Sequence, residues 1–139
     1  MQTPPLKLSA IIDTNVWISG LVFGGNPEKV IRQFVDGHFF VVMAEELISE
    51  LRRKITQRFP LFISNLALLE ASIREEAIFV KLGTLHVAVS RDVDDNKFIE
   101  AAVIGGAENI ISGDKDLLGL KQYKNIKIIK PAEFLDLFD

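Results

Sequence analysis

The stretch that decides the fold is Leu8-Ser9-Ala10-Ile11-Ile12-Asp13-Thr14-Asn15, in which a short apolar run ends directly at an aspartate. The run carries no charge on either face, which predicts a strand buried on both sides. A second run, Asn109 to Ser112, is followed by Gly113 and Asp114 in the same way. Because ligands collect at the carboxyl ends of parallel strands, we expect Asp13 and Asp114 to face one pocket.

Outward from these two runs, strand-like and helix-like patterns alternate along the chain. Alternation with short connections predicts an α/β domain, a three-layer α/β/α sandwich with a central, mainly parallel sheet. The further strand-like runs are 38–43, 78–82 and 126–129, and 86–89 fits either a small strand or an extended connection. Helical spacing covers 16–23, 28–35, 44–58, 61–77, a helix that starts near Asp92 to Asp95, 113–118 and 131–138, with a break at 24–27.

Composition narrows the class of protein further. With 139 residues, 48% hydrophobic and 25% charged, the chain is expected to form one domain over 1–139. It has no cysteine, which excludes disulfides, thiolate zinc sites and a cysteine nucleophile, and favours a cytoplasmic location. No stretch has the roughly 20 apolar residues that a membrane span needs, and Met1 to Lys7 does not resemble a signal peptide.

The charged and metal-binding side chains set limits on possible partners. A net charge of -3 excludes the broad basic surface of many DNA-binding domains, so any contact with nucleic acid must be local. Two histidines are too few for a histidine-rich metal site. Carboxylates therefore remain as the candidate ligands, and they favour hard ions such as Mg²⁺ or Mn²⁺.

Several carboxylates have both a structural and a functional interpretation. Asp13, Asp95, Asp114 and Asp116 each stand where a helix begins, and an aspartate there commonly caps the helix. Glu50 flanks an apolar helical stripe and has Lys54 one turn later, so it fits a surface ion pair. The combination favours function, because converging carboxylates require a bound cation or raised pKa values. Metal-assisted hydrolysis of a phosphodiester is the chemistry that such a pocket supports.

The acidic residues and their neighbours resemble a known family over nearly the whole chain. Asp13-Thr14-Asn15, Glu50, Asp95 with the later Ala101-Ala102, and the stretch Ser112 to Asp116 are similar to the PIN-domain nucleases. The chain looks closest to the VapC-like branch, the toxin components of toxin-antitoxin pairs. Its ending, Pro131-Ala132-Glu133-Phe134-Leu135, also suits that branch.

The resemblance implies roles for particular residues. Metal coordination falls to Asp13, Glu50, Asp95 and Asp114, and Asp116 completes the catalytic set. Asn15 and Ser112 would orient the bound cofactor through hydrogen bonds; the family more often has threonine in place of Ser112, which retains the hydroxyl. The implied activity is Mg²⁺- or Mn²⁺-dependent hydrolysis of single-stranded RNA by a homodimer, inhibited by a cognate antitoxin protein.

Other features leave alternatives open. Arg52, Arg53, Lys54 and Arg58 would either hold RNA phosphates or form the solvated face of a helix. Trp17 and Phe23 could stack on bases or form a dimer contact, with core packing favoured over both. The competing functions are a structure-specific DNA nuclease and a PIN-like module that binds RNA or protein without cutting it.

Overall fold

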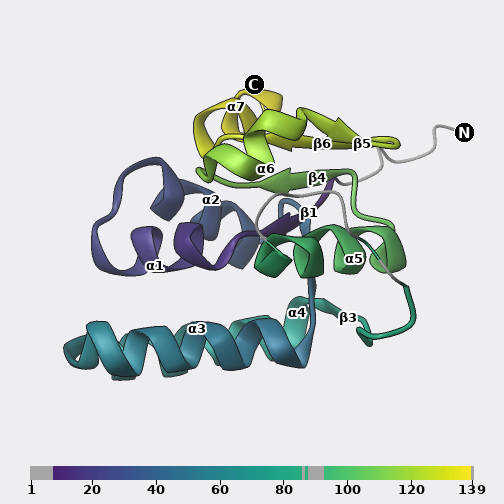
Figure 1. Cartoon of the computed structure of the whole chain (residues 1–139). Coiled ribbons are helices and arrows are strands. Elements are labelled where there is room, and N and C mark those ends of the chain that lie inside the picture. The colour runs from purple at the N-terminus through teal and green to yellow at the C-terminus, as the bar shows by residue number, and fades with distance from the viewer. Residues whose placement is uncertain (1–7, 86, 88–92, 139) are drawn as a thin grey trace, which may run out of the picture.

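A six-stranded sheet forms the centre of the computed structural model, which describes residues 8–85, 87 and 93–138. The strand order is β3-β2-β1-β4-β6-β5, with all neighbours parallel except the pair formed by β5 and β6. Figure 1 shows this order from β3 below to β6 and β5 above. The strands are β1 (Ser9–Ile12), β2 (Phe40–Met43), β3 (Ile78–Phe79), β4 (Asn109–Ile111), β5 (Gln122–Tyr123) and β6 (Ile126–Ile129).

Helices connect the parallel strands and cover the sheet, which confirms the predicted three-layer α/β/α arrangement with a mainly parallel sheet. Short 3₁₀ turns occupy Pro60–Phe62, Val93–Asp95 and Asp136–Phe138. The helices are α1 (Thr14–Val22), α2 (Gly25–Val35), α3 (Glu45–Arg58), α4 (Ile63–Glu76), α5 (Asn96–Gly105), α6 (Lys115–Leu120) and α7 (Pro131–Leu135). No helix in the described ranges is long and apolar enough to cross a membrane.

The central strands are buried as their uncharged sequences predict. β1 pairs with β4 so that Ile11 lies opposite Ile110, and both side chains are fully buried. The predicted stripe of α3 is buried as well, through Leu47, Ile48, Leu51 and Ile55. Because β1 and β4 are parallel, their carboxyl ends meet at the same edge of the sheet.

An aromatic cluster joins α2 to the end of the chain. Phe39, just before β2, has its ring 4.8 Å from that of Phe134 in α7 and 6.2 Å from that of Phe34 in α2. Edge-to-face and tilted ring pairs of this kind stabilise beyond the area that they bury. The cluster therefore holds α7 beside α2, at the carboxyl edge where β6 ends.

Several predicted boundaries differ from the structure. α2 begins at Gly25 and includes Pro27, so the predicted break at 24–27 is wrong beyond Gly24; proline is tolerated in a first helical turn, where its missing N–H has no partner to lose. β3 ends at Phe79 rather than Leu82. The two-residue β5 was not predicted, because two residues show no period. Asp92 and, apart from Val87, the segment 86–89 lie outside the described residues.

The two aromatics of the first helix have different environments. Trp17 is buried, and its ring meets the Phe34 ring edge-on at 6.0 Å, as core packing predicts. Core packing is wrong for Phe23, whose surface is 74% exposed. Phe23 follows α1, and its ring lies 5.7 Å from that of Phe59, the residue after α3. A helix end that projects beyond the sheet leaves its last apolar residue in solvent.

Candidate functional site

A chain of hydrogen bonds links the residues that follow β1 and β4. The Asp13 amide donates to the Ile111 carbonyl at 2.9 Å, which ties the end of β1 to the end of β4. The Ser112 hydroxyl donates to Asp13 Oδ2 at 2.7 Å and accepts from the Asp114 amide at 2.9 Å. Asp13 and Ser112 are both buried. A single hydroxyl therefore connects the two aspartates that the sequence predicts at one edge.

Both aspartates also cap helices, so the capping interpretation is correct for them. Asp13 Oδ1 accepts from the Asn15 amide at 3.2 Å at the start of α1. Asp114 Oδ1 accepts from the amides of Asp116 at 2.8 Å and Leu117 at 3.2 Å at the start of α6. Capping fixes the orientation of each carboxylate, and it leaves Asp114 Oδ2 outside these capping bonds. A structural and a functional role are thus compatible in the same side chain.

Three carboxylates converge beside this chain of hydrogen bonds. One oxygen from each of Asp95, Asp114 and Asp116 lies within 4.8 Å of the other two. Asp95 precedes α5 and is buried, whereas Asp114 and Asp116 at the start of α6 are half-buried. The first turns of two helices, from segments about twenty residues apart, therefore meet at one point. We call Asp95, Asp114 and Asp116 the aspartate cluster.

The aspartate cluster fits a divalent cation such as Mg²⁺ or Mn²⁺. Its donors are all carboxylate oxygens, the ligand type that these hard ions take. Oxygens bound about 2.1 Å from one ion are at most about 4.2 Å apart. The separations in the aspartate cluster are close to this limit, so small side-chain rotations would bring the three oxygens onto one ion. Three converging negative charges also favour a cation on electrostatic grounds.

Asp13 carries a further sign of an unfavourable buried charge. Burial raises the pKa of its carboxyl, and the nearby Asp114 charge raises it too. The hydrogen bonds from Ser112 and from the Asn15 amide, and the positive charge of Lys54, oppose that shift without cancelling it. A cation near the aspartate cluster would lower the cost of ionising Asp13.

Glu50 lies in a different electrostatic environment from the four aspartates. Its carboxylate pairs with Lys54 one helical turn later at 3.1 Å, and with Lys97 from the first turn of α5. Burial disfavours the charged form, but the hydrogen bonds from the two lysines outweigh it and lower the pKa of Glu50. The predicted pair with Lys54 is therefore present, and the aspartate cluster does not include Glu50.

The two lysines nevertheless bring Glu50 to the border of the site. Lys54 acts on the charge of Asp13 as well as on Glu50, and Lys97 follows Asp95 by two positions. The pair with Lys54 is predicted from the sequence, but the pair with Lys97 is not, since Lys97 and Glu50 are remote along the chain. Helical spacing alone gives the Lys54 pair, whereas the Lys97 pair depends on how α3 and α5 cross.

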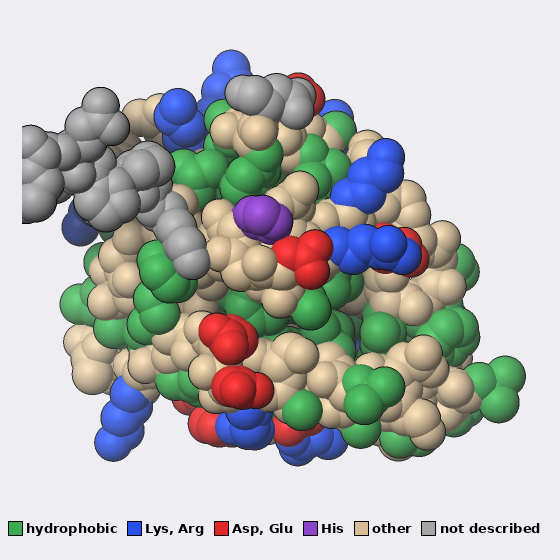
Figure 2. All heavy atoms as spheres, turned by 180° about the vertical axis from the view of Figure 1, so that it is seen from behind, with side chains coloured by type: hydrophobic (Ala, Val, Ile, Leu, Met, Phe, Trp, Pro, Cys, Tyr) green, Lys and Arg blue, Asp and Glu red, His purple; other side chains and the backbone are tan. Residues whose placement is uncertain are grey.

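The predicted basic cluster of α3 is divided among different partners. Arg52 pairs with Glu70 of α4 at 2.7 Å, whereas Lys54 turns to Glu50. Arg53 and Arg58 are exposed. On the face that Figure 2 shows, basic side chains are scattered among acidic, polar and apolar ones. The four residues therefore form no single basic surface for phosphates.

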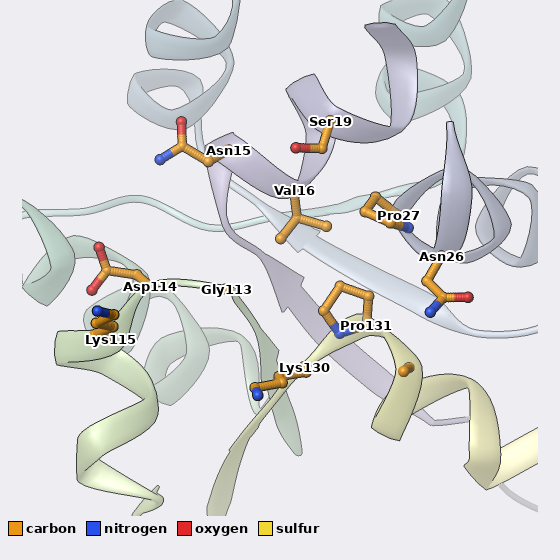
Figure 3. Close-up of a pocket in the computed structure, with 11 residues that line it drawn as sticks. Asn15, Val16, Ser19, Asn26, Pro27, Gly113, Asp114, Lys115, Lys130 and Pro131 are labelled. Atoms are coloured by element: carbon orange, nitrogen blue, oxygen red, sulfur yellow. The ribbon is translucent and has the colours of Figure 1, made fainter. Parts of the chain in front are cut away.

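A groove of about 700 Å³ opens from Asp114 along the carboxyl edge of the sheet. The Asn15 side chain lines it, so Asn15 contacts Asp13 through its backbone amide and the groove through its carboxamide. Figure 3 shows side chains from α1, α2, α6 and α7 around this groove. Ser19, Asn26 and Lys130 were missed as candidate site residues, because nothing in their local sequence distinguishes them from ordinary surface positions.

Comparison with known proteins agrees with this geometry. A family model described as "PIN domain" matches residues 9–116, which include β1, the aspartate cluster and Ser112. The chain is also similar to an uncharacterized protein, MJ1680, of Methanocaldococcus jannaschii. The two are 29% identical over 148 residues, which cover 96% of this chain and 94% of that protein.

Proposed function

Because this chain belongs to the PIN-domain family, whose members are generally metal-dependent nucleases, we propose that it hydrolyses phosphodiester bonds of single-stranded RNA with Mg²⁺ or Mn²⁺. The observation that carries the proposal is the convergence of Asp95, Asp114 and Asp116 within 4.8 Å. Asp13 is joined to that cluster through Ser112. We propose Asp13, Glu50, Asp95, Asp114 and Asp116 as the catalytic set of a cytoplasmic enzyme.

The residues have separate tasks in this proposal. Asp95, Asp114 and Asp116 would hold the cation, with Asp13 contributing its charge from the buried side. A divalent ion held by these residues would supply Lewis-acid chemistry, which activates water and offsets the charge developing on the phosphodiester. Ser112 and the Asn15 amide keep Asp13 in a fixed orientation through their hydrogen bonds. Preorganised ligands of this kind lose little entropy when the substrate arrives.

Glu50 has a different task from the one implied by the resemblance alone. Its two lysine partners are also close to the aspartates: Lys54 lowers the pKa of Asp13, and Lys97 stands two positions after Asp95. We propose that Glu50 holds the Lys54 and Lys97 ammoniums beside the site, where they meet substrate phosphates, and joins the cation's ligands only when a lysine moves away. Ammonium groups are effective point charges for phosphate.

We propose further that this chain is the toxin of a toxin-antitoxin pair, that it acts as a homodimer, and that a cognate antitoxin protein inhibits it. Apolar side chains on its surface are available for such protein contacts. Phe23, Leu61 and Leu68 are at least 74% exposed. Exposed apolar side chains of this size are typical of interaction surfaces when they are contiguous. The molar mass in solution, measured by light scattering, tests the homodimer directly.

Cleavage of a labelled single-stranded RNA tests the proposed activity. We expect cleavage with Mg²⁺ or Mn²⁺, none with a chelator, and a loss of at least about a hundredfold in kcat/KM for Asp114→Asn, since even residues that only support metal ligands contribute ten- to a hundredfold. Asparagine caps helices as well as aspartate, so the variant keeps its fold. Asp36→Asn, at the exposed end of α2, is the matched control and should keep full activity.

The outcome separates the proposal from its competitors. Equal cleavage by the parent and Asp114→Asn would mean a contaminating nuclease or a wrong site. Cleavage of flapped or branched DNA in preference to RNA would favour a structure-specific DNA nuclease. Binding of RNA without cleavage under every metal condition would favour a non-catalytic module.

A further inference from the structure

The groove beside Asp114 has a composition that the aspartate cluster does not explain. It lies where α1, α6 and α7 follow β1, β4 and β6, so its walls come from the carboxyl ends of three parallel strands. Its volume of about 700 Å³ is within the range of about 300–1,000 Å³ that is usual for ligand pockets. It opens directly at Asp114, one of the three carboxylates of the aspartate cluster. A molecule held at that cluster would therefore continue into the groove.

The groove is apolar in the middle and polar at its ends. Val16, Pro27 and Pro131 lie between the two ends in Figure 3. Asn15 and Asp114 lie on one side of the groove in Figure 3, and Asn26 lies on the other. Flat apolar surfaces with a few polar groups at the edge suit a planar, partly polar ring better than they suit a metal ion or a sugar alone.

Two lysines line the same groove: Lys115 stands between Asp114 and Asp116 in the sequence, and the Glu133 carboxylate accepts from the backbone amide of Lys130 rather than from its ammonium. No carboxylate of the described residues lies within ion-pair distance of Lys115 or Lys130. Lys54 and Lys97, by contrast, are paired with Glu50. Exposed, unpaired ammoniums beside an apolar floor favour an anionic ligand.

We propose that this groove binds the nucleotide adjacent to the cleaved phosphodiester, with its base on Val16, Pro27 and Pro131, its base edge at Asn26, and its phosphate at Lys130. The assignment rests on the proposed nuclease function, because it takes the scissile phosphate to lie at the aspartate cluster. Asn15 and Ser19 would contact the sugar and phosphate on the α1 side of the groove. The ligand class is thus one unpaired nucleotide of a continuing strand.

The same geometry gives a reason for preferring unpaired over paired bases. A carboxamide such as that of Asn26 donates and accepts, so it can form two hydrogen bonds with a base edge. In a duplex the Watson–Crick edge is already occupied by the complementary base. Only an unstacked base can enter the groove and present that edge. The preference for single strands therefore has a physical origin in Asn26 and in the shape of the groove.

Equilibrium binding of a fluorescein-labelled single-stranded RNA, measured by anisotropy with a chelator present, tests the phosphate contact. We expect Lys130→Ala to weaken binding by roughly fivefold at low salt, equally for all sequences. The slope of log Kd against log salt should fall by about 0.7, the contribution of one phosphate contact on a single strand. Lys124→Ala is the matched control, since Lys124 stands in the turn before β6, at the opposite edge of the sheet.

The same assay with the four homopolymeric RNAs tests the base contact. We expect Asn26→Ala to compress the differences in affinity among the four bases by about fivefold or more, because a paired carboxamide contact discriminates between bases by about 1–3 kcal/mol. The salt slope should stay at the parent value, since Asn26 carries no charge. Lys130→Ala should therefore change the salt slope, and Asn26→Ala should change the differences in affinity among the bases.

The results distinguish this inference from the proposed function on which it rests. If the parent binds and cleaves RNA but Lys130→Ala and Asn26→Ala both match it in affinity, salt slope and base preference, the groove is not the nucleotide subsite and the nuclease proposal stands. If the parent neither binds nor cleaves RNA, both proposals fall. A loss for Lys124→Ala equal to that for Lys130→Ala would show unspecific charge effects and also overturn the subsite.

Discussion

At the scale of single residues, the surroundings of Asp13 act on its ionised carboxylate in opposite directions. Burial raises the pKa of its carboxyl above the ordinary value of 3.8, and hydrogen bonds from Ser112 and the Asn15 amide only partly oppose this. A raised folded pKa means that the native state holds the proton more tightly than the unfolded state does. Asp13 therefore stabilises the fold below pH 3.8 and loses that contribution as the pH rises through its folded pKa.

The substitution Asp13→Asn tests whether the buried charge of Asp13 destabilises the fold. Without metal, we expect the variant to have a higher Tm than the parent at pH 7, because a neutral carboxamide avoids the cost of a buried charge. The advantage should shrink as the pH falls below the raised folded pKa, where Asp13 is itself neutral. Thermal unfolding from pH 3 to pH 7 measures both effects, with Asp36→Asn as the exposed control. A variant that is less stable than the parent at pH 7 and equally stable at pH 3 would contradict the interpretation.

Glu50 shows the opposite balance at the same scale. The lysine hydrogen bonds lower the pKa of Glu50 in spite of its burial, so its charged form stabilises the fold. That contribution is present above the unfolded pKa and is lost as the pH falls through the lowered folded pKa. The chain's own lysines thus outweigh burial at Glu50, whereas the hydrogen bonds to Asp13 do not outweigh its burial beside Asp114.

At the scale of elements, the site depends on how closely helices approach each other. α1 and α2 cross at Gly20, where an added Cβ would stand 2.9 Å from the carbonyl carbon and oxygen of Pro27. Because these are backbone atoms, no side-chain rotation relieves the overlap. Gly20 thus sets the spacing that places Pro27 and Asn26 on the wall of the groove.

Gly20→Ala should therefore disturb both stability and the groove. We expect the free energy of unfolding to fall by about 1–3 kcal/mol, the usual cost of overpacking, despite the higher helix propensity of alanine. Denaturant unfolding measures this loss. Gly119→Ala is the matched control, since a Cβ there meets nothing within 4 Å and alanine is favoured in a helix by up to about 1 kcal/mol. Equal stability of Gly20→Ala and the parent would show that α2 moves freely relative to α1.

At the scale of the whole molecule, the candidate site joins segments from both halves of the chain. Asp13 comes from the first strand, and the aspartate cluster comes from the starts of α5 and α6. A cation that bridges these segments binds only the folded chain. It should therefore stabilise the fold as a whole, by mass action.

A metal-dependent shift of Tm follows from this arrangement. At a Mn²⁺ concentration about a hundred times Kd, binding adds about 2.7 kcal/mol, which corresponds to roughly 10 °C for a chain of this length. We expect the shift in the parent and its near loss in Asp95→Asn and Asp114→Asn, measured by differential scanning fluorimetry. Asp36→Asn should keep the full shift. An undiminished shift in both cluster variants would place the cation elsewhere in the molecule.

Much of the fold and part of the site follow from the sequence by itself. Apolar runs such as Leu8 to Ile12 and helical stripes such as that of α3 are local patterns, and burial of those patterns determines the alternation of strands and helices. The positions of Asp13 and Asp114 after their strands are local too. The sheet edge at which they meet follows from parallel pairing, which the same alternation predicts.

Only the tertiary structure decided which side chains meet across elements. It set the distances at which Asp95 and Asp116 approach Asp114, added Lys97 to the pair of Glu50 with Lys54, left Phe23 in solvent, and assembled the groove from four helices. These contacts depend on the angles and distances at which helices cross, and those are set by packing of the whole core. Sequence periodicity indicates the face that a helix buries, but it contains no information on the distance between two charged groups on different helices.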